Sequence, residues 1–419
     1  MQKDIQTIFL AAGKSSRMHP ISDKNFLEFL GEPLLLKLLK NAHEGGLKHF
    51  VIVGNDENIE KIKNICNENE FLKDSIVTKQ ENQKDGMAGG ILEGLKHVSN
   101  ENELFILGGN DFVDAEIYSK IIHKSKDFDG GILAKKVDHY FPGGYLNINE
   151  NRKILKIQEK PKEGNEPSNL VNIIGHYFKN VKALKKQLKN ISCKDNNGYE
   201  QALHNLFKKS NFLAVEYSDF WHTIKYPWHV LEISEAFIKN ELRITNFKLK
   251  DFEEISSSVF VHKTAKIANS VKLKEGPIFI DEGASVLENA VIIGPCYIGK
   301  NAIIGNNALV RNSNIGENSV IGYNTEIARS FLGKNINTHI AYIGDSIIDD
   351  SVNIGAYTCT ANLRLDKKNI KVNIMGNNID SGLKKLGAII AKDCQIGIHT
   401  MLMPGVKIEK NISPGMLVK

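Results

Sequence analysis

The residues best suited to chemistry come at the start of the 419-residue chain, directly after the short apolar run Thr7-Ile8-Phe9. This run continues into Leu10-Ala11-Ala12-Gly13, and Arg17 and Lys24 follow at a spacing of seven residues. Small side chains let backbone N–H groups approach phosphate oxygens closely, and the two basic side chains add positive charge. The segment therefore predicts a strand that opens into a loop around a triphosphate.

Two better-known phosphate loops do not fit this segment. Gly13-Lys14-Ser15 resembles the end of a Walker A motif, but Ile8 stands where that motif needs a glycine. The dinucleotide-binding pattern also lacks its other glycines. The segment instead resembles the signature of the sugar-1-phosphate nucleotidyltransferases, and its arginine-to-lysine spacing is that of the bifunctional N-acetylglucosamine-1-phosphate uridyltransferases. A polar turn with chance basic residues is the alternative interpretation.

The rest of the N-terminal half alternates two kinds of apolar pattern. Runs typical of strands, at 49–53 and 104–107, alternate with helical patterns at 59–66 and 92–98. This alternation predicts a Rossmann-like α/β domain with a mostly parallel sheet. Ligands of such sheets gather at the carboxyl ends of the strands, where polar segments of this chain are expected to lie.

The resemblance to the nucleotidyltransferases implies a role for each of these polar segments. Gln80 and Gly86 resemble the segment that reads the nucleotide base, and Leu107-Gly108-Gly109-Asn110-Asp111 resembles the motif whose aspartate holds Mg²⁺. Glu159-Lys160-Pro161 resembles the segment that binds the sugar and its phosphate. The implied site residues are Leu10, Ala11, Ala12, Gly13, Gln80 and Gly86 for the nucleotide, Arg17 and Lys24 for catalysis, Gly144, Glu159, Lys160 and Asn172 for the sugar phosphate, and Asp111 for the metal.

Three positions in this half depart from the family pattern. Thr223 stands where relatives place an aspartate as the second metal ligand, and Met87 replaces a threonine after the base-site glycine. Asp23 replaces a proline and sets a negative charge beside Lys24, which weakens the hold of that lysine on an anion. With these departures, three interpretations of the N-terminal domain stay open: it is active, it uses a different nucleotide, or it is inactive.

A different periodicity occupies the C-terminal third. Aliphatic residues recur every six positions, with a single five-residue step, at Ile280, Val286, Ile292, Ile298, Ile304, Val310, Ile315, Ile321 and Ile327. This period is typical of a hexapeptide β-helix, in which each segment forms one flat side of a triangular coil and points its aliphatic residue inward. Ordinary hairpins would not hold one period over this length. The pattern predicts a left-handed parallel β-helix, and because such coils associate in threes we expect a homotrimer.

The period breaks at segments that resemble the acetyltransferase half of the same bifunctional enzymes, most closely their archaeal-type members. These segments are 338–345, 352–356 and 361–368. The resemblance implies that His339 is the general base for the amine of glucosamine-1-phosphate as it attacks acetyl-CoA, a task that suits the pKa of histidine. Asn362 would hold the acetyl carbonyl or orient this base. The remaining implied contacts are Arg311, Arg329, Tyr342 and Asn353 with the sugar phosphate, and Ala356 and Ala388 with acetyl-CoA.

The leading interpretation is a bifunctional enzyme that makes UDP-N-acetylglucosamine from glucosamine-1-phosphate, acetyl-CoA and UTP. One departure bears on it, since Ala328 replaces a phosphate-binding lysine and Arg329 is expected to supply charge from the next position. Three alternatives stay open. They are a nucleotidyltransferase for another sugar, such as glucose-1-phosphate with dTTP or UTP, an acetyltransferase with a degenerate first domain, and a non-catalytic scaffold like the exchange subunits of translation factors.

Composition agrees with a cytoplasmic enzyme. The chain holds no apolar run long enough to span a bilayer and starts with charged and polar residues where a signal peptide would be apolar. Its five scattered cysteines argue against a disulfide framework. A net charge of +5 is consistent with small anionic substrates, and we expect neither a nucleic acid nor a membrane as a partner. The predicted domains are a nucleotidyltransferase at 1–245, a linker at 246–258 and a β-helix acyltransferase at 259–419.

Overall fold

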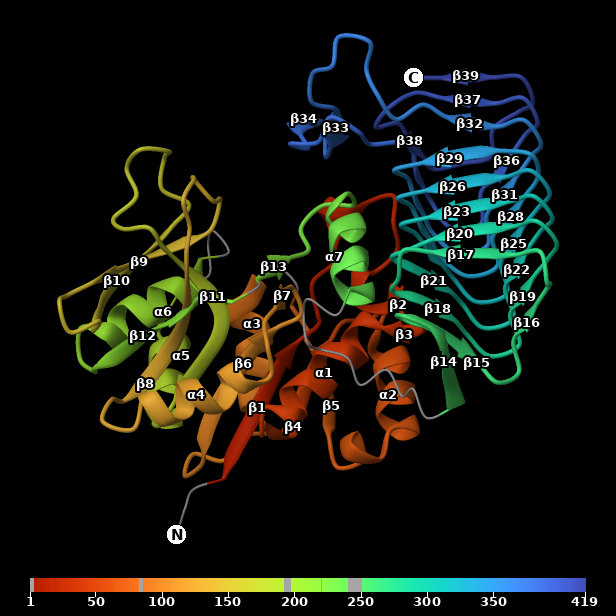
Figure 1. Ribbon diagram of the computed structural model, residues 1–419. Helices are drawn as coiled ribbons and strands as arrows, with labels where there is room; N and C mark the ends of the chain where they lie inside the picture. The colour runs from red at the N-terminus through yellow and green to blue at the C-terminus, as the bar shows by residue number, and fades with distance from the viewer. Residues whose placement is uncertain (1–3, 83–85, 192–196, 220, 240–250) are drawn as a thin grey trace. The chain divides into compact units, whose positions relative to one another are not determined.

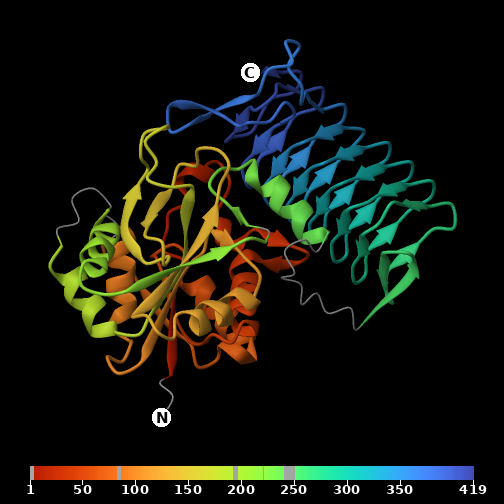
Figure 2. The ribbon, with the colours of Figure 1, turned by 60° about the vertical axis from the view of Figure 1, so that its left-hand side comes forward.

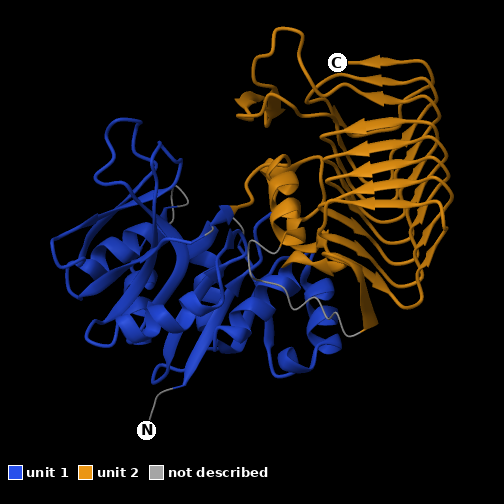
Figure 3. Ribbon diagram, in the orientation of Figure 1, with its two compact units in different colours: residues 1–14, 35–222 blue, residues 15–34, 223–419 orange. Residues whose placement is uncertain are grey.

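The computed structural model describes residues 4–82, 86–191, 197–219, 221–239 and 251–419, which form two compact units (Figure 3). The first unit holds residues 1–14 and 35–222, and the second holds 15–34 and 223–419. These units differ from the predicted boundary near residue 245, because residues 15–34 and a helix after residue 228 pack with the coil. Of the predicted linker, 246–250 lie outside the described residues, and most of the remainder is a strand of the coil.

A mixed sheet forms the centre of the first unit (Figure 1). Its parallel part has the order β6-β1-β4-β5, and β8 and β12 are a second parallel pair. The long strand β11 runs antiparallel to both β6 and β8, so the Rossmann-like fold predicted from the sequence carries an antiparallel extension. The strands of this sheet are β1 (Ile5–Leu10), β4 (Lys48–Gly54), β5 (Ile76–Lys79), β6 (Glu103–Gly108), β8 (Gly130–Lys136), β9 (Gly144–Ile148), β10 (Ile154–Glu159), β11 (Leu170–Phe178) and β12 (Phe212–Tyr217). The short strands β7 (Asp111–Phe112) and β13 (His222–Thr223) are not part of it.

Helices bury both faces of this sheet. Ile8 of β1 joins an apolar cluster with side chains of α3, α5 and α6, while the next residue, Phe9, lies with Leu38 of α1 and Tyr118 of α4. Successive side chains of a strand point to opposite faces, so this alternation places a helical layer on each side. The helices are α1 (Leu34–Glu44), α2 (Ile59–Glu68), α3 (Gly86–Leu95), α4 (Glu116–Lys124), α5 (Val181–Lys189) and α6 (Gly198–Phe207). Among the helices that the structure describes, none is long and apolar enough to cross a bilayer.

The coil of the second unit is built from three parallel sheets. The first contains β14 (Phe252–Ser256), which pairs antiparallel to β15 (Val259–His262), and then β18 (Ile278–Ile280), β21 (Cys296–Ile298), β24 (Asn314–Ile315), β27 (Phe331–Leu332), β30 (Ile347–Ile348), β35 (Ile389–Ile390) and β38 (Lys407–Ile408). The second contains β16 (Lys266–Ile267), β19 (Ser285–Val286), β22 (Ile303–Ile304), β25 (Val320–Ile321), β28 (Asn337–Thr338), β31 (Asn353–Ile354) and β36 (Gln395–Ile396). The third contains β17 (Lys272–Lys274), β20 (Val291–Ile293), β23 (Leu309–Arg311), β26 (Glu326–Ala328), β29 (Tyr342–Gly344), β32 (Cys359–Thr360), β37 (Met401–Leu402) and β39 (Leu417–Val418).

The aliphatic period predicted from the sequence is the core of this coil, and the left-handed β-helix is confirmed. All nine residues of the period are buried in one apolar cluster. Asparagines such as Asn301 and Asn307 turn the chain at the corners with positive φ, a conformation that asparagine tolerates well. At Gly299 a Cβ atom would lie 2.7 Å from the carbonyl oxygen of Ile315 on the next turn, so only glycine fits there.

One insertion interrupts the coil between β32 and β35. It carries the antiparallel hairpin of β33 (Lys371–Ile374) and β34 (Asn377–Asp380), which projects from the coil in Figure 2. The N–H of Leu386 donates to the carbonyl of Asn362 at 3.0 Å and so joins the end of the insertion to its beginning. The insertion therefore leaves the stacking of the turns unbroken.

Residues 15–34 pack against the coil together with α7 (His229–Ile238). They contain the short strands β2 (Glu28–Phe29) and β3 (Glu32–Pro33). The ring of Phe29 is fully buried, with its centroid 5.2 Å from that of Phe237 and 5.3 Å from that of Phe331. Nearby, Lys334 pairs with Glu28, and the N–H of Ser22 donates to Asp349 at 2.7 Å. The segment that carries Arg17 and Lys24 is therefore held by the coil.

We expect the substitution Phe29→Ala to lower the free energy of unfolding by about 3–5 kcal/mol, because it leaves a cavity between the two other rings. Denaturant unfolding followed by circular dichroism measures this loss. Leu365→Ala is the matched control, since Leu365 is fully exposed, and it should change the stability by less than about 0.5 kcal/mol. Equal effects of the two substitutions would contradict this packing.

Candidate active sites

The loop after β1 is held by two buried asparagines from the loop after β4. The N–H of Ala11 donates to the carbonyl of Val53 at 2.8 Å. The side-chain amide of Asn58 donates to the carbonyl of Ala11 at 2.9 Å, and that of Asn55 donates to the carbonyl of Ala12 at 3.1 Å. The sequence analysis missed these asparagines, although an Asn-x-x-Asn step directly after a strand is a readable signal.

The backbone of this loop suits an anion. The N–H groups of Ala12 and Gly13 donate to no acceptor in the described part of the chain. A Cβ atom on Gly13 would meet nothing within 4 Å, so the space beside this residue is open. N–H groups that face open space at a strand-to-loop transition are the features with which phosphate loops bind their ligand.

Arg17 and Lys24 lie in the second unit, on two consecutive 3₁₀ helices. Arg17 is exposed within Ser16–Met18, and its guanidinium lies 6.0 Å from the centroid of the Tyr226 ring. Lys24 begins the helix Lys24–Phe26, whose N-cap is Asp23. The Asp23 carboxylate accepts hydrogen bonds from the backbone and side-chain amides of Asn25, at 3.1 and 2.8 Å. The aspartate that departs from the family pattern therefore has a structural role as a helix cap.

The structure brings Gln80 and Gly86 together. The side chain of Gln80 is buried, and its amide donates to the carbonyl of Gly86 at 2.9 Å and to that of Asn82 at 3.0 Å. The residues between Asn82 and Gly86 lie outside the described part of the chain. The predicted base-reading pair is thus connected directly, through the side chain of one residue and the backbone of the other.

Asp111 follows the end of β6 and accepts a hydrogen bond. Its Oδ1 atom accepts from the indole N–H of Trp221 at 3.1 Å, and the Trp221 ring packs against Phe141 with centroids 5.0 Å apart. Within the described residues there is no group of three or more His, Cys, Asp or Glu side chains that could hold a metal ion. A metal at Asp111 would therefore take most of its ligands from substrate and water.

Three of the predicted sugar-site residues meet at the β9–β10 pair. Gly144 is directly opposite Glu159, and a Cβ atom on Gly144 would lie 3.0 Å from a Glu159 carboxylate oxygen. Lys160 forms an ion pair with Glu159 at 3.2 Å. The structure adds Glu200, in the first turn of α6, whose pKa is raised by burial and is sensitive to the charges of Glu159 and Lys160. In the sequence, Glu200 is a common type of first-turn acid, which explains why the analysis missed it.

Asn172, the fourth predicted sugar-site residue, ends a buried chain of hydrogen bonds. His176 is fully buried, which lowers its pKa to about 3 and keeps its ring neutral. Nε2 of His176 lies 2.8 Å from Oδ1 of Asn172, an oxygen that only accepts, so Nε2 carries the ring proton and donates it to that oxygen. Nδ1 is then an acceptor, and the hydroxyl of Tyr199, whose pKa burial raises far above its usual range, donates to it at 2.6 Å. The amide NH₂ of Asn172 is left as a donor.

On the coil, four of the predicted acetyl-transfer residues lie on or beside its third sheet, namely Arg311, Arg329, Tyr342 and Asn362. Arg311 ends β23 and forms a charge-assisted pair with Glu326, with donor–acceptor distances of 3.1 and 2.7 Å. Ala328, opposite Arg311 on the next strand, is fully buried, so this position offers no charge to a ligand. His339 is exposed at the corner before β29, and Tyr342 on β29 is partly exposed.

The two alanines predicted to contact acetyl-CoA differ in exposure. Ala356 and the predicted sugar-phosphate residue Asn353 are partly exposed, as a ligand contact requires. Ala388 lies in the coil core, its N–H donates to Ser346 at 3.0 Å, and its carbonyl accepts from the N–H of Ile347 at 2.9 Å. The methyl group of Ala388 is therefore buried and its backbone groups are bonded within the coil, so the predicted contact with acetyl-CoA has no exposed group of this residue to support it.

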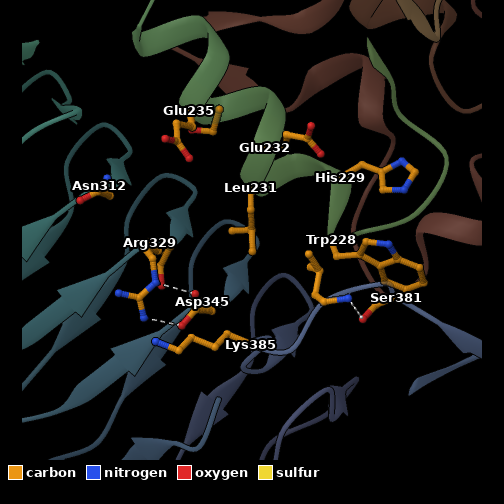
Figure 4. A pocket seen from close by; sticks show the side chains of 13 residues that line it. Trp228, His229, Leu231, Glu232, Glu235, Asn312, Arg329, Asp345, Ser381 and Lys385 are labelled. Atoms are coloured by element: carbon orange, nitrogen blue, oxygen red, sulfur yellow. Dashed lines mark hydrogen bonds and ion pairs between the residues drawn. The ribbon is translucent and has the colours of Figure 1, made fainter. Parts of the chain in front are cut away.

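A pocket of about 350 Å³ opens within the second unit beside the coil (Figure 4). Arg329 lies in its wall and donates two hydrogen bonds to the carboxylate of Asp345, at 2.7 and 2.6 Å. From the sequence, Arg329 is expected to supply positive charge to the sugar phosphate, but in the structure the Asp345 carboxylate neutralises that charge. The pocket is lined by Trp228, His229, Leu231, Glu232, Ser234, Glu235, Asn312, Arg329, Ser330, Asp345, Ser381, Leu383 and Lys385.

Comparison with known proteins relates the whole chain to enzymes of two activities. Residues 6–224 match the nucleotidyl transferase family, and residues 277–312 match the bacterial transferase hexapeptide family. The chain is 31% identical to the bifunctional sugar-1-phosphate nucleotidylyltransferase/acetyltransferase of Sulfurisphaera tokodaii, over 99% of this chain and 97% of that protein. It is 30% identical to the bifunctional protein GlmU of Methanococcus maripaludis, over 97% and 92% respectively. This chain therefore belongs to the nucleotidyl transferase family and, over its full length, to the bifunctional sugar-1-phosphate nucleotidylyltransferase/acetyltransferases.

Proposed function

We propose that this protein makes UDP-N-acetylglucosamine from glucosamine-1-phosphate in two steps, acetylation on the coil and uridylyl transfer in the nucleotidyltransferase domain. The observation that carries the proposal is the similarity to bifunctional relatives over 97% or more of the chain. Both candidate sites add support, because an open backbone loop for an anion and an exposed histidine on the coil stand where the resemblance expects them.

The uridylyl transfer needs alignment and charge neutralisation more than it needs a protein nucleophile. An oxygen of the sugar phosphate attacks the α-phosphorus of UTP, a new P–O bond forms, and pyrophosphate leaves. The N–H groups of Ala12 and Gly13 are suited to the phosphates, and the resemblance to the family gives Arg17 and Lys24 the same task. Asn172, whose side-chain oxygen accepts from His176, presents its NH₂ to a sugar oxygen.

Mg²⁺ is the metal that this chemistry implies, and the residues present fit it in part. Asp111 offers a carboxylate, and magnesium accepts a site with one protein carboxylate because it keeps several waters and binds substrate phosphates. The hydroxyl of Thr223 is a neutral and therefore weaker ligand than the aspartate of the family pattern. When bound, Mg²⁺ would neutralise charge on the α-phosphate and on the leaving pyrophosphate.

The acetyl transfer needs a general base. The neutral amine of glucosamine-1-phosphate attacks the thioester carbonyl of acetyl-CoA, a C–N bond forms and the C–S bond breaks. His339 takes a proton from the amine and passes it to the departing sulfur, so that coenzyme A leaves as its thiol. Arg311 and Tyr342 are proposed to contact the sugar phosphate, and Ala356 acetyl-CoA. We also propose a homotrimer assembled through the flat faces of the coil, which sedimentation in solution tests.

Two substitutions separate the half-reactions. Asp111→Ala should reduce the release of pyrophosphate by about 100-fold or more while leaving thiol release from acetyl-CoA unchanged, and His339→Ala should do the reverse. Each variant is the folding control for the other. The assay mixes glucosamine-1-phosphate, acetyl-CoA, UTP and Mg²⁺ and identifies the products by mass spectrometry.

Each product pattern has a distinct meaning. UDP-N-acetylglucosamine establishes both steps and shows that Thr223 is tolerated. N-acetylglucosamine-1-phosphate with untouched UTP indicates an acetyltransferase whose first domain is degenerate or uses another nucleotide. No product contradicts the proposal and favours another sugar or a scaffold.

The buried His176 predicts a pH dependence of stability. Its pKa is lowered in the folded protein, so below the unfolded pKa, near 6.5, the unfolded chain binds a proton that the folded chain does not. The free energy of unfolding should therefore fall by about 1.4 kcal/mol per pH unit from this one group as the pH drops below about 6.5. Urea unfolding at a series of pH values measures this slope.

Two variants isolate the contribution of His176. In His176→Gln the part of the slope due to this group should disappear, and the KM for the sugar phosphate should rise because Asn172 loses its partner. In His123→Gln, which changes an exposed histidine of α4, the slope should remain. An unchanged slope in His176→Gln would contradict the buried neutral imidazole.

A further inference from the structure

Four side chains at one corner of the coil form a continuous network. Asp345 is buried and accepts two hydrogen bonds from Arg329. The same carboxylate accepts from the amide nitrogen Nδ2 of Asn362 at 2.5 Å, and this nitrogen also donates to the Tyr342 hydroxyl oxygen at 3.2 Å. The network therefore runs from a half-buried guanidinium to two residues predicted to contact substrates.

The carboxylate determines the direction of every hydrogen bond in this network. An ionised carboxylate only accepts hydrogen bonds, so Asn362 must turn its NH₂ group toward Asp345. The two N–H bonds of that group are then both used, one by Asp345 and one by Tyr342. Oδ1 of Asn362 accepts no hydrogen bond from any residue in the described ranges, and the side chain is partly exposed. The Tyr342 oxygen accepts, which leaves its own proton free to be donated outward.

We propose that Arg329 and Asp345 are positioning residues for acetyl transfer, which hold Asn362 with its amide oxygen, and not its NH₂, toward the substrates. This inference rests on the proposed function. Arg329 then acts through Asp345 and not as a phosphate ligand, because its fork of N–H groups is already matched by the carboxylate. Figure 4 shows the pair at the wall of the pocket, where the side chain of Lys385 extends toward it.

The orientation decides which substrate group Asn362 contacts. An outward amide oxygen accepts an N–H of the sugar amine and cannot donate to the acetyl carbonyl. Holding one N–H in this way aims the nitrogen lone pair at the thioester carbon. As the N–C bond forms and the C–S bond breaks, a proton of the amine passes to His339, which returns it to the departing sulfur to give the thiol of coenzyme A. Tyr342, as an outward donor, suits an oxygen of the sugar phosphate.

The test exchanges the two network groups. Asp345→Asn removes the carboxylate that orients the amide, and Asn362→Asp places two carboxylates side by side. The double variant Asp345→Asn/Asn362→Asp restores one carboxylate and one amide in contact, keeps the net charge, and again offers an outward acceptor oxygen. Glu282→Gln is the matched control, because it removes the carboxylate of an exposed ion pair with Lys300 elsewhere on the coil.

The readouts are the kcat for acetyl transfer per folded protein, the KM for acetyl-CoA and the melting temperature. We expect each single variant to lose about 10- to 100-fold in kcat with little change in the KM for acetyl-CoA, as for other residues that orient a catalytic group. The double variant should recover at least about ten-fold over Asn362→Asp, and the control should match the wild type.

Two results would overturn the proposal. One is an Asp345→Asn variant within about two-fold of the wild-type kcat, and the other is a double variant no more active than Asn362→Asp. The second comparison stands even where Asp345→Asn fails to fold, since both of its variants keep a carboxylate within the network. A wild-type protein without acetyl transfer refutes the proposed function instead, so the two failures are distinguishable.

Discussion

The inward stack of aliphatic side chains in the coil is the constraint on which the rest of the second unit depends. Burial of one such side chain on every flat segment fixes how each turn lies on the next. Residues 16 or 17 positions apart then become neighbours on adjacent turns, as Arg329 and Asp345 are, and likewise Asp345 and Asn362. A site on this coil is therefore a ladder of corner residues whose spacing is set by the apolar core beneath it.

The two candidate sites use the same physical device to orient an amide. In each, a buried side chain bonded to one end of the amide leaves the other end for a ligand. The ionised Asp345 can only accept, which turns the amide oxygen of Asn362 outward. The neutral His176 donates from Nε2 to the Oδ1 atom of Asn172, and this leaves the NH₂ of Asn172 as the outward donor. One site thus offers an acceptor and the other a donor, although both place an asparagine at the surface.

The fold could be predicted from the sequence because both domains produce apolar patterns that repeat over short stretches of the chain. A six-residue aliphatic repeat depends only on which side chains face inward, and the structure confirms it from Ile280 to Ile327. The pairing of Arg329 with Asp345 could not be found in this way, since it requires the register between turns. Asn55 and Asn58 also act across the sheet, on a loop more than forty residues earlier in the chain. Ala388 matched a motif by position, but its burial depends on where the insertion rejoins the coil.

The departures from the family pattern differ in their consequences for the proposed site. In the sequence, the negative charge of Asp23 is expected to weaken the binding of an anion by Lys24. In the structure, the Asp23 carboxylate accepts hydrogen bonds from the backbone and side-chain amides of Asn25 and caps a helix, so part of its charge is compensated there. Thr223 has no such compensation for a metal ion, because a hydroxyl supplies neither charge nor a second carboxylate oxygen. In the proposed reaction, the nucleotidyltransferase half would therefore rely on charges that its substrates and a metal ion bring with them. The coil instead matches its charges within the fold, through Arg311 with Glu326 and Arg329 with Asp345.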